Sequence, residues 1–299
     1  MEWYFALAFL LSLILLFMAI GTPIALAFLA ANVIGAWHFM GGQTGILQML
    51  NNGFGALSSF NLVPTPLFLL MGELFFRTGL GMKMFNAVDQ LMGKVPGRLS
   101  YVTVVGGTAF STLSGSSMGS TALMGSLLVP EMERRGYKKK MAIGPILGTG
   151  GLAIIIPPSA LAVLLATLAK VDIGALLIAG ILPGLTLAGF YIATIFIQTK
   201  LDPLAAPNYE LEPVPLSAKL KLIVTDILPM LSVMVIIVTL MLIGFATPSE
   251  AAAFGALGVI ILAFIFRCMT WEAFKLSVTG ALKVTLMAYL IVFGSATFS

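Results

Sequence analysis

The chain has 299 residues, of which 59% are hydrophobic and only 9% are charged, and its mean hydropathy is +1.07. A soluble domain carries about 25% charged residues, so no water-soluble core could absorb this apolar surplus, and the solvent is predicted to be lipid. The formal charge of +4 comes from Lys and Arg residues in short loops between apolar stretches, which indicates membrane topology and argues against nucleic acid as a partner.

Apolar stretches long enough to cross a hydrocarbon layer about 30 Å thick recur along the chain. The first, residues 3–20, follows Glu2 instead of a basic segment and lacks a small-residue cleavage pattern, so we interpret it as a retained span rather than a signal peptide. The other predicted spans are residues 23–39, 62–77, a double segment 99–131, 141–170, 173–199, 228–245, 249–266 and one that begins near Val284. We therefore expect an all-α polytopic membrane protein.

Polar or amphipathic pieces connect these spans, and they cover residues 40–61, 78–98, 132–140, 200–227 and 267–283. The stretch Met82–Arg98 places its apolar side chains near one face, and Trp271–Lys283 shows a weaker pattern of the same kind. Both are predicted to be helices that lie in the membrane interface. Residues 201–215 contain four prolines and are predicted to form the one irregular, exposed linker.

The basic residues predict an orientation, because cytoplasmic loops are enriched in Lys and Arg. With the N-terminus outside, 15 of the 16 basic residues fall on the cytoplasmic side and only Lys170 lies outside.

This count requires the segment 99–131 to begin and end on the same side. Its two apolar halves, about 14 residues each, flank Ser114–Ser120 and are too short to cross. One long kinked crossing is the alternative, but 33 residues at a rise of 1.5 Å exceed what a bilayer needs. We predict a re-entrant helical hairpin.

A short sequence echo suggests an internal repeat. Thr22-Pro23, at the start of the second predicted span, resembles Thr247-Pro248, which lies 225 residues later at the last complete one. The orientation above places the first turn inside and the second outside, as in the inverted-topology repeats of secondary transporters. Chance similarity in an Ala-rich membrane chain is the alternative. On the repeat hypothesis, a partner of the hairpin tip would lie near position 339, so we expect a second hairpin and a second broken helix to be missing from this sequence.

Irregular backbone at membrane depth must be buried in protein or line a wet cavity. Two places require it: the hairpin tip, residues 111–120, and the span 141–170, where Gly148–Gly151 is followed by Ile156-Pro157-Pro158-Ser159. Freed carbonyls and hydroxyl oxygens suit Na⁺, while the N-termini of half-helices suit an anion. The alternative, that small residues only allow close helix packing, is preferred for the other glycines, which are Gly180, Gly184, Gly189, Gly255 and Gly258.

Groups that could carry protons are scarce within the predicted spans. Glu73 is expected to pair with Arg77, Glu250 to lie in the first turn of a helix, and His38 to mark a membrane boundary beside Trp37. A proton relay usually needs an intramembrane carboxylate or histidine, so Na⁺ coupling is expected rather than H⁺ coupling. The single cysteine belongs to no metal-binding cluster. An enzyme would need a nucleophile with a nearby base inside the spans, and the sequence offers no such combination.

Four motifs follow one another along the chain: Leu113-Ser114-Gly115-Ser116-Ser117, then Pro130-Glu131-Met132 with Arg135-Gly136-Tyr137, then Gly150-Gly151 before Ile156-Pro157-Pro158-Ser159, and Ala179-Gly180-Ile181-Leu182-Pro183-Gly184. In this order and spacing, residues 1–299 resemble the large membrane (M) subunit of tripartite ATP-independent periplasmic (TRAP) transporters. Members of that family are longer and contain a second hairpin, so the resemblance also implies that this sequence is incomplete at its C-terminus.

The resemblance implies an inverted-repeat, elevator-type importer of organic acids, such as C4-dicarboxylates or sialic acid, in a bacterial or archaeal inner membrane with a periplasmic N-terminus. It further implies coupling to Na⁺, a small membrane (Q) subunit and a periplasmic substrate-binding protein. The corresponding parts of the chain would be residues 1–98 for scaffold spans and an arm helix, 99–170 for the transport part, 171–227 for a span and a cytoplasmic linker, and 228–299 for the start of the second repeat. The nearest rival is a stand-alone Na⁺/dicarboxylate symporter of similar architecture, which needs no binding protein.

The resemblance also assigns candidate site residues. In the family, the first hairpin and the broken helix after it form one Na⁺ site, so the implied metal ligands are Ser111 and Ser114 and the carbonyls near Ala153, Ile156 and Pro158. Family members often have Gly where Ala153 aligns, and a carbonyl ligand survives that change. The residues expected to face the substrate are Ser116, Ser117, Thr149 and Gly150.

Overall fold

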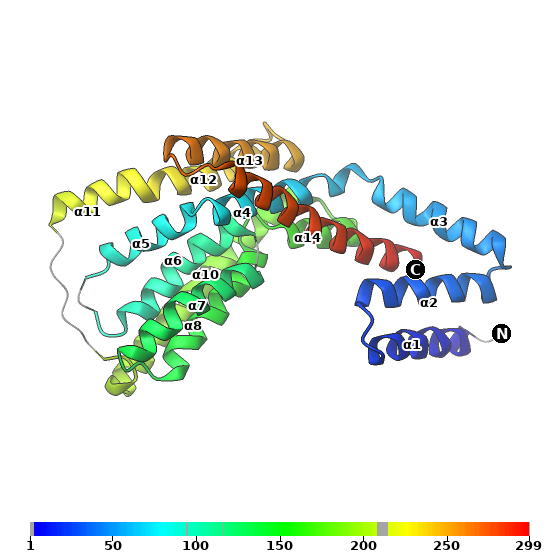
Figure 1. Ribbon diagram of the computed structural model, residues 1–299, viewed down its shortest axis with the longest axis horizontal. Coiled ribbons are helices and arrows are strands. Elements are labelled where there is room, and N and C mark those ends of the chain that lie inside the picture. Colours follow the sequence, from blue (N-terminus) through cyan, green and yellow to red (C-terminus); the bar gives the residue numbers. More distant parts are fainter. Residues whose placement is uncertain (1–2, 94, 116, 208–214, 299) are drawn as a thin grey trace. The chain divides into compact units, whose positions relative to one another are not determined.

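The structure is a computed structural model that describes residues 3–93, 95–115, 117–207 and 215–298, and these residues are helical over most of their length (Figure 1). The chain divides into two compact units. We call residues 1–63 with 282–299 the N-terminal unit, and residues 64–281 the central unit. Each is described by itself.

The N-terminal unit contains α1 (Trp3–Ala19), α2 (Ile24–Phe39), α3 (Gln43–Leu57), a short 3₁₀ turn (Phe60–Leu62) and the second part of α14 (Trp271–Phe298). In sequence order, α1 packs on α2 and α2 on α3. The Asn32 amide on α2 donates hydrogen bonds to the Gly294 carbonyl (2.6 Å) and the Thr297 hydroxyl (2.7 Å) on α14. These bonds join α2 to the end of α14. A buried amide is stable in an apolar interior only when it is paired, so separating the two helices would leave Asn32 without partners.

The 3₁₀ turn of this unit is joined to α14 by a second polar contact. The Tyr289 hydroxyl donates a hydrogen bond to the Leu62 carbonyl (2.9 Å). Pro66, four residues after Leu62, has no N–H to offer that carbonyl. The tyrosine therefore supplies the hydrogen bond that the proline cannot make.

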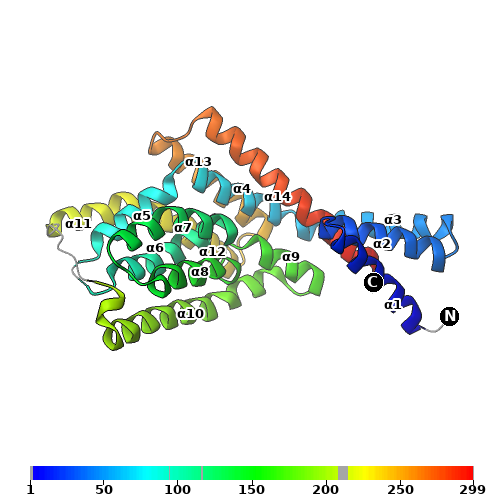
Figure 2. The ribbon, with the colours of Figure 1, turned by 60° about the horizontal axis from the view of Figure 1, so that its bottom comes forward.

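The central unit begins with α4 (Pro64–Arg77), α5 (Leu80–Leu91), α6 (Arg98–Ser114), α7 (Ser117–Arg134), α8 (Lys139–Ile155), α9 (Ala160–Ala169) and α10 (Ile173–Leu201). The helices α6, α7 and α8 pack on one another and lie side by side in Figures 1 and 2, while α5 and α10 cover α6 and α8 from outside the hairpin. A buried cluster that includes Val102, Met132 and Met141 fills the space between them.

The central unit continues with a 3₁₀ turn (Pro203–Ala205), α11 (Leu216–Leu222), a π-helical turn (Ile223–Ile227), α12 (Leu228–Leu242), α13 (Pro248–Ile265) and the start of α14. Here α13 packs on both α12 and α4. A second buried cluster, with Phe68, Met71 and Val233 among its members, lies between α4, α9, α12 and α13. The hairpin helices are thus flanked by two separate apolar cores.

Length and composition identify four described helices that could cross a membrane: Ile173–Leu201, Leu216–Leu242, Pro248–Ile265 and Trp271–Phe298. The number rises to six if Gln43–Leu57 with Phe60–Arg77, and Lys139–Ile155 with Ala160–Ala169, each form one span. The shorter apolar helices α1 and α2 match the first two predicted spans. The expectation of an all-α, polytopic membrane protein is therefore confirmed.

One helix and the exposure of one linker differ from the sequence predictions. The prediction of an interfacial helix over 271–283 followed by a separate span is wrong, because α14 runs without interruption from Trp271 to Phe298. The linker has the predicted bounds, because α10 ends at Leu201 and α11 begins at Leu216, but part of it is buried rather than exposed. Ala205 and Ala206 are buried, and the Lys138 N–H donates a hydrogen bond to the Ala205 carbonyl (2.9 Å). Helical structure resumes at residue 216. Residues 208–214 of the predicted linker lie outside the described part.

The predicted amphipathic helix Met82–Arg98 exists, but it is α5 and ends at Leu91. Gly93, Pro96 and Gly97 follow it, and these residues favour a turn. Its apolar face is buried in the protein: a side chain at Gly81 would collide with the Phe110 ring of α6. The periodicity that suggested lipid contact therefore reflects packing on the hairpin.

Candidate functional site

The hairpin tip gathers serine hydroxyls at the end of α6. Gly115 ends that helix in the left-handed conformation (φ 58°), which glycine adopts without strain. Ser114 Oγ lies 2.6 Å from Ser120 Oγ and 3.1 Å from the Ser111 carbonyl oxygen. Ser111 is fully buried, and among the described residues its hydroxyl has no hydrogen-bond partner. A buried hydroxyl without a partner is costly and is often explained by an ion or water bound beside it.

The predicted break in span 141–170 is confirmed. The helix α8 ends at Ile155, α9 begins at Ala160, and their axes differ by 49°, a bend that can be followed in Figure 2. Ser159 caps α9 by accepting a hydrogen bond from Ala162 N–H (3.2 Å), and its hydroxyl donates to the Ile154 carbonyl (2.8 Å). Pro158 could not donate that bond, and Pro157 likewise has no N–H for the Ala153 carbonyl. The break thus releases backbone oxygens in a buried segment.

The tip and the break lie together. A Cβ placed on Gly115 would lie 3.8 Å from the Pro158 carbonyl oxygen, so the turn of the hairpin reaches the paired prolines. Contacts also join the hairpin to the middle of α8. A Cβ on Gly107 of α6 would lie 3.1 Å from Thr149 Oγ1 of α8, and a Cβ on Gly150 of α8 would collide with Thr121 Oγ1 of α7. Both arms of the hairpin therefore contact the first half of the broken helix.

A third element, α4, closes the tip from another side. A Cβ on Gly72 would fall on the Ser114 carbonyl, and the Phe68 carbonyl oxygen lies 3.9 Å from the Cβ position of Gly115. The helix α4 was not predicted to be part of the site. The signal in the sequence was Gly72, a glycine within a mostly apolar helix, where glycine costs about 1 kcal/mol relative to alanine.

The structure brings part of the implied Na⁺ site together. Ser111 and Ser114 lie at the tip that Pro158 approaches, and Ala153 and Ile156 are buried in the segment that contains the break. These oxygens are the kind that suit a hard monovalent cation. Among the described residues, no group of three or more His, Cys, Asp or Glu side chains could hold a metal ion.

The residues expected to face the substrate have different surroundings. Thr149 is fully buried and its hydroxyl donates to the Pro145 carbonyl of its own helix (2.8 Å), while Gly150 is packed on Thr121. Ser117 is half-buried at the first residue of α7. Ser116 lies outside the described residues.

The glycines assigned to packing mostly have that role. A Cβ on Gly180 would meet the Ile155 carbonyl, and one on Gly184 would meet the Ile156 side chain. A Cβ on Gly255 would meet the side chains of Ile237 and Met71, and one on Gly258 would lie 3.5 Å from the Val233 side chain. At Gly189 no atom of the described residues lies within 4 Å of an added Cβ, so these residues give the packing interpretation no support there. The helix α10 therefore uses two glycines to lie close to Ile155 and Ile156, where the helix breaks.

Charged side chains gather at the end of the hairpin opposite the tip. Arg98 is buried and pairs with Asp89 (3.0 Å), Glu131 pairs with Arg135 (2.5 Å), and Lys138 pairs with Asp202 (2.6 Å). Burial raises the pKa of Asp89, and Arg98 partly offsets that rise, whereas the hydrogen bond from Lys138 lowers the pKa of Asp202. These pairs join α5 to α6 and α8 to the end of α10.

Glu73 and Glu250 have the surroundings that the sequence predicts. Glu73 pairs with Arg77 (3.2 Å), and its carboxylate also lies against Gly280 of α14. Glu250 and Thr247 form a capping box at the start of α13. These carboxylates therefore have partners away from the hairpin tip.

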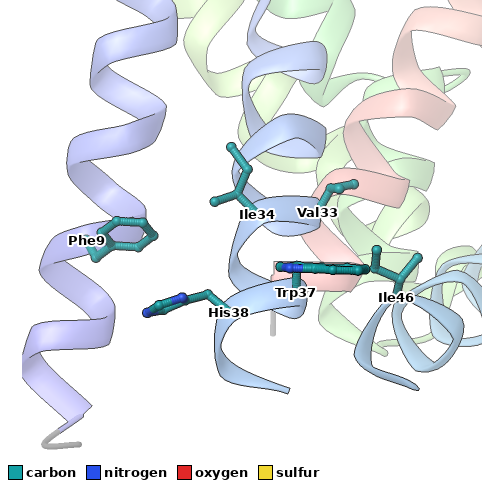
Figure 3. A pocket seen from close by; sticks show the side chains of 6 residues that line it. All are labelled: Phe9, Val33, Ile34, Trp37, His38 and Ile46. Carbon is teal, nitrogen blue, oxygen red and sulfur yellow. The ribbon is translucent and has the colours of Figure 1, made fainter. Parts of the chain in front are cut away.

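His38 lines a shallow, mostly apolar pocket of about 270 Å³ in the N-terminal unit (Figure 3). Side chains of α1, α2 and α3 line it, and they are Phe9, Val33, Ile34, Trp37, His38 and Ile46. His38 packs on the Phe9 and Phe39 rings, with centroids 6.0 and 4.9 Å away. It has aromatic neighbours and is not part of a polar cluster.

A polytopic helical membrane protein with a hairpin packed against a broken helix is the class that this fold and site define. Residues 11–299 match the model of the family described as tripartite ATP-independent periplasmic transporter, DctM component. The chain belongs to this family, which confirms the resemblance that its motifs suggested.

Relatives with known names support the assignment. The chain is 30% identical over 248 residues to the C4-dicarboxylate TRAP transporter large permease protein DctM of Pseudomonas aeruginosa, covering 82% of this chain and 57% of that protein. It is 32% identical over 279 residues to the 2,3-diketo-L-gulonate TRAP transporter large permease protein YiaN of Escherichia coli, covering 92% and 63%. Against the sialic acid TRAP transporter large permease protein SiaM of Vibrio cholerae, the identity is 27% over 286 residues, covering 95% and 65%. The chain thus spans about three fifths of the length of these relatives.

Proposed function

We propose that this chain is the transport-carrying part of a Na⁺-driven secondary importer of an organic acid anion in a bacterial or archaeal inner membrane. The observation that carries the proposal is the meeting of the hairpin tip with the proline break, where Gly115 approaches the Pro158 carbonyl. Two interrupted helices that share one buried location are what an intramembrane ion and substrate site requires. Close packing alone would not need both interruptions.

The donor set favours Na⁺ as the coupling ion. Ser111 offers a buried hydroxyl oxygen, Ser114 lies one helical turn away, and the break releases the Ala153 carbonyl from its usual N–H partner. All of these are neutral oxygen atoms, which suit a hard cation and cannot relay a proton as a carboxylate does. Glu73 is near in sequence to Gly72, but its carboxylate pairs with Arg77.

The N-termini of two helices lie at this convergence and favour an anionic substrate there. The helices α7 and α9 begin at Ser117 and Ala160, on either side of the convergence, and helix N-termini favour negative charge. The relatives are named for C4-dicarboxylates, 2,3-diketo-L-gulonate and sialic acid, all of which are organic acids. We therefore keep Ser116, Ser117, Thr149 and Gly150 as the proposed substrate side of the site.

The positions of the helices support an inverted repeat and, with it, an elevator-type alternation of access. Adding 225 to the bounds of α1 and α2 gives residues 228–244 and 249–264, while α12 and α13 span Leu228–Leu242 and Pro248–Ile265. Under the same offset, α4 corresponds to the end of α14. The packing is reciprocal, since α2 contacts the end of α14 in the N-terminal unit and α13 contacts α4 in the central unit.

Membership of the family suggests two protein partners, a small membrane (Q) subunit and a periplasmic substrate-binding protein. The second candidate function is a stand-alone Na⁺/dicarboxylate symporter without a binding protein. Proteoliposomes that hold the full-length protein and its small subunit separate these possibilities. We expect accumulation of a labelled organic acid only with an inward Na⁺ gradient and the binding protein together. Accumulation without the binding protein would favour the symporter, and accumulation driven by a proton gradient with Na⁺ absent would refute Na⁺ coupling.

A matched pair of variants tests the proposed ligand. Ser111→Ala removes the buried, unpartnered hydroxyl, whereas Ser126→Ala removes an exposed hydroxyl of α7 that bonds the Leu123 carbonyl (2.9 Å). We expect Ser111→Ala to raise the Na⁺ concentration for half-maximal uptake by about tenfold, equivalent to about 1.4 kcal/mol. Ser126→Ala should leave it unchanged. Equal values for both variants would remove Ser111 from the site.

A further inference from the structure

The helix α3 has three distinct faces, and within the described part of the chain only one of them packs on protein. Its buried residues are Gly45, Met49 and Gly53. A Cβ on Gly45 would lie 2.5 Å from the Ala36 carbonyl oxygen of α2, and one on Gly53 would collide with the Phe293 ring of α14. The two glycines therefore let α3 lie directly on its neighbours in the N-terminal unit.

The other two faces are exposed and differ in chemistry. Leu47, Leu50 and Phe54 are 57%, 46% and 72% exposed and fall on one stripe of the helix. Thr44, Gln48, Asn51 and Asn52 are also exposed and fall on another stripe. At about 100° per residue, the buried, apolar and polar stripes are roughly 120° apart. No residue of α3 is charged.

An apolar surface on α2 adjoins the start of α3 through Ile46, the residue before Leu47. Ile46 of α3 lines the pocket beside Trp37 and Ile34, and Figure 3 shows the Ile46 side chain next to the Trp37 ring. Trp37 is 60% exposed in the last turn of α2, and Trp is enriched where a bilayer meets water. Only the turn Met40–Gly42 separates this level from the start of α3.

We infer that α3 lies along the bilayer surface, with Leu47, Leu50 and Phe54 in the acyl boundary and Gln48, Asn51 and Asn52 in water. An amphipathic helix with separate apolar and polar stripes takes this position. If α3 instead crossed the membrane as the first half of a broken span, its exposed amides would lie at membrane depth, where unpaired polar groups are costly. The inference needs neither the proposed substrate nor the proposed orientation.

Spin labels measure this arrangement directly. Single cysteines replace Leu47, Leu50, Phe54, Gln48 and Asn51, one at a time, in the full-length protein with Cys268→Ala, and each variant is labelled with a nitroxide in phospholipid vesicles. Collision rates with oxygen, which concentrates in lipid, and with a water-soluble nickel chelate then give the depth of each label. The matched control is a set along α13, a helix long enough to span, at the exposed residues Phe254, Leu257, Ile261 and Phe264.

We expect the labels at positions 47, 50 and 54 to report one common depth and to collide more with oxygen, and those at positions 48 and 51 to collide more with nickel. Along α13 the depth should change by up to about 15 Å between Phe254 and Phe264, at 1.5 Å per residue. A steady change of about 10 Å from Leu47 to Phe54 would show that α3 crosses the bilayer and would overturn the inference. Low collision rates with both reagents at positions 47 and 50 would overturn it too, because a protein partner would then cover that stripe.

Discussion

Gly72 of α4 lies directly against the carbonyl of Ser114, the last helical residue before the hairpin turns. Any side chain at position 72 would meet backbone rather than a mobile side chain, so the tip would have to shift to make room. We expect Gly72→Ala to displace the tip, to lower stability by about 1–3 kcal/mol as overpacking does, and to reduce uptake strongly. Uptake by reconstituted protein and thermal unfolding in detergent measure the two effects.

The control for this substitution is Gly125→Ala on α7, where nothing lies within 4 Å of the added carbon. Alanine favours a helix over glycine by about 1 kcal/mol, so this variant should be as stable as the parent or slightly more stable. If Gly72→Ala behaved in the same way, α4 would not press on the tip.

The contact between Gly150 and Thr121 allows a double-mutant test. Gly150→Ala should destabilise the protein because the new carbon would collide with Thr121 Oγ1. Thr121→Ala removes that oxygen, so the double variant should recover part of the loss, with a coupling of about 0.5–3 kcal/mol in thermal unfolding. Strictly additive effects would mean that α8 and α7 are not in contact at this point.

The sequence was most informative where the backbone is interrupted. The hairpin was predicted over 99–131 and is formed by Arg98–Ser114 and Ser117–Arg134, and the break was predicted at Ile156–Ser159, where it occurs. Both depend on local chemistry, since glycine and serine favour turns and proline removes N–H donors. Such signals need no knowledge of distant residues.

Contacts between distant segments could not be predicted in this way. Nothing near Gly72 in sequence indicates that Ser114 lies against it, and the pattern of α5 could not show whether its apolar face meets lipid or α6. The continuity of α14 was missed because the amphipathic pattern of residues 271–283 suggested a separate helix in the interface. The absence of a helix-breaking proline in this stretch was the signal for one continuous helix. Amphipathic periodicity identifies a buried face but not what buries it.

Ser114 tests the proposed coupling at the tip itself. Its hydroxyl lies within hydrogen-bond distance of Ser120 Oγ, so Ser114→Ala should loosen the tip and raise the Na⁺ concentration for half-maximal uptake. Ser114→Leu should abolish uptake, because a bulky side chain has no space in this buried position (4% exposed). Membrane insertion and assembly with the small subunit should persist in both variants. Normal Na⁺ dependence in Ser114→Ala would argue against a role of this serine in ion binding.

The pair of Lys138 and Asp202 predicts a pH-dependent contribution to stability. The hydrogen bond from Lys138 lowers the pKa of Asp202 below its usual 3.8. The stabilisation is therefore fully present above pH 3.8 and is lost as the pH falls through the lower pKa of the folded state. Asp202→Asn should lower the melting temperature slightly at neutral pH and remove this part of the acid sensitivity. The effect should be small, since the pair is partly solvated, and the exposed Glu133→Gln serves as the control.

The hairpin also predicts that its two ends lie on the same side of the membrane. Lys83 precedes the hairpin and Lys139 follows it, and both are exposed. If the segment between them enters and leaves on one side, cysteines at these positions, placed singly in a Cys268→Ala background, should react with a membrane-impermeant maleimide from the same face. The distribution of basic residues predicts that this face is the cytoplasmic one. A cysteine at Gln43, in the piece predicted to be external, should react only from the opposite face. Labelling of Lys83→Cys and Lys139→Cys from opposite faces would instead mean that α6 and α7 together cross the membrane once, as one kinked span, and the proposed ion site at the tip would then have to be abandoned.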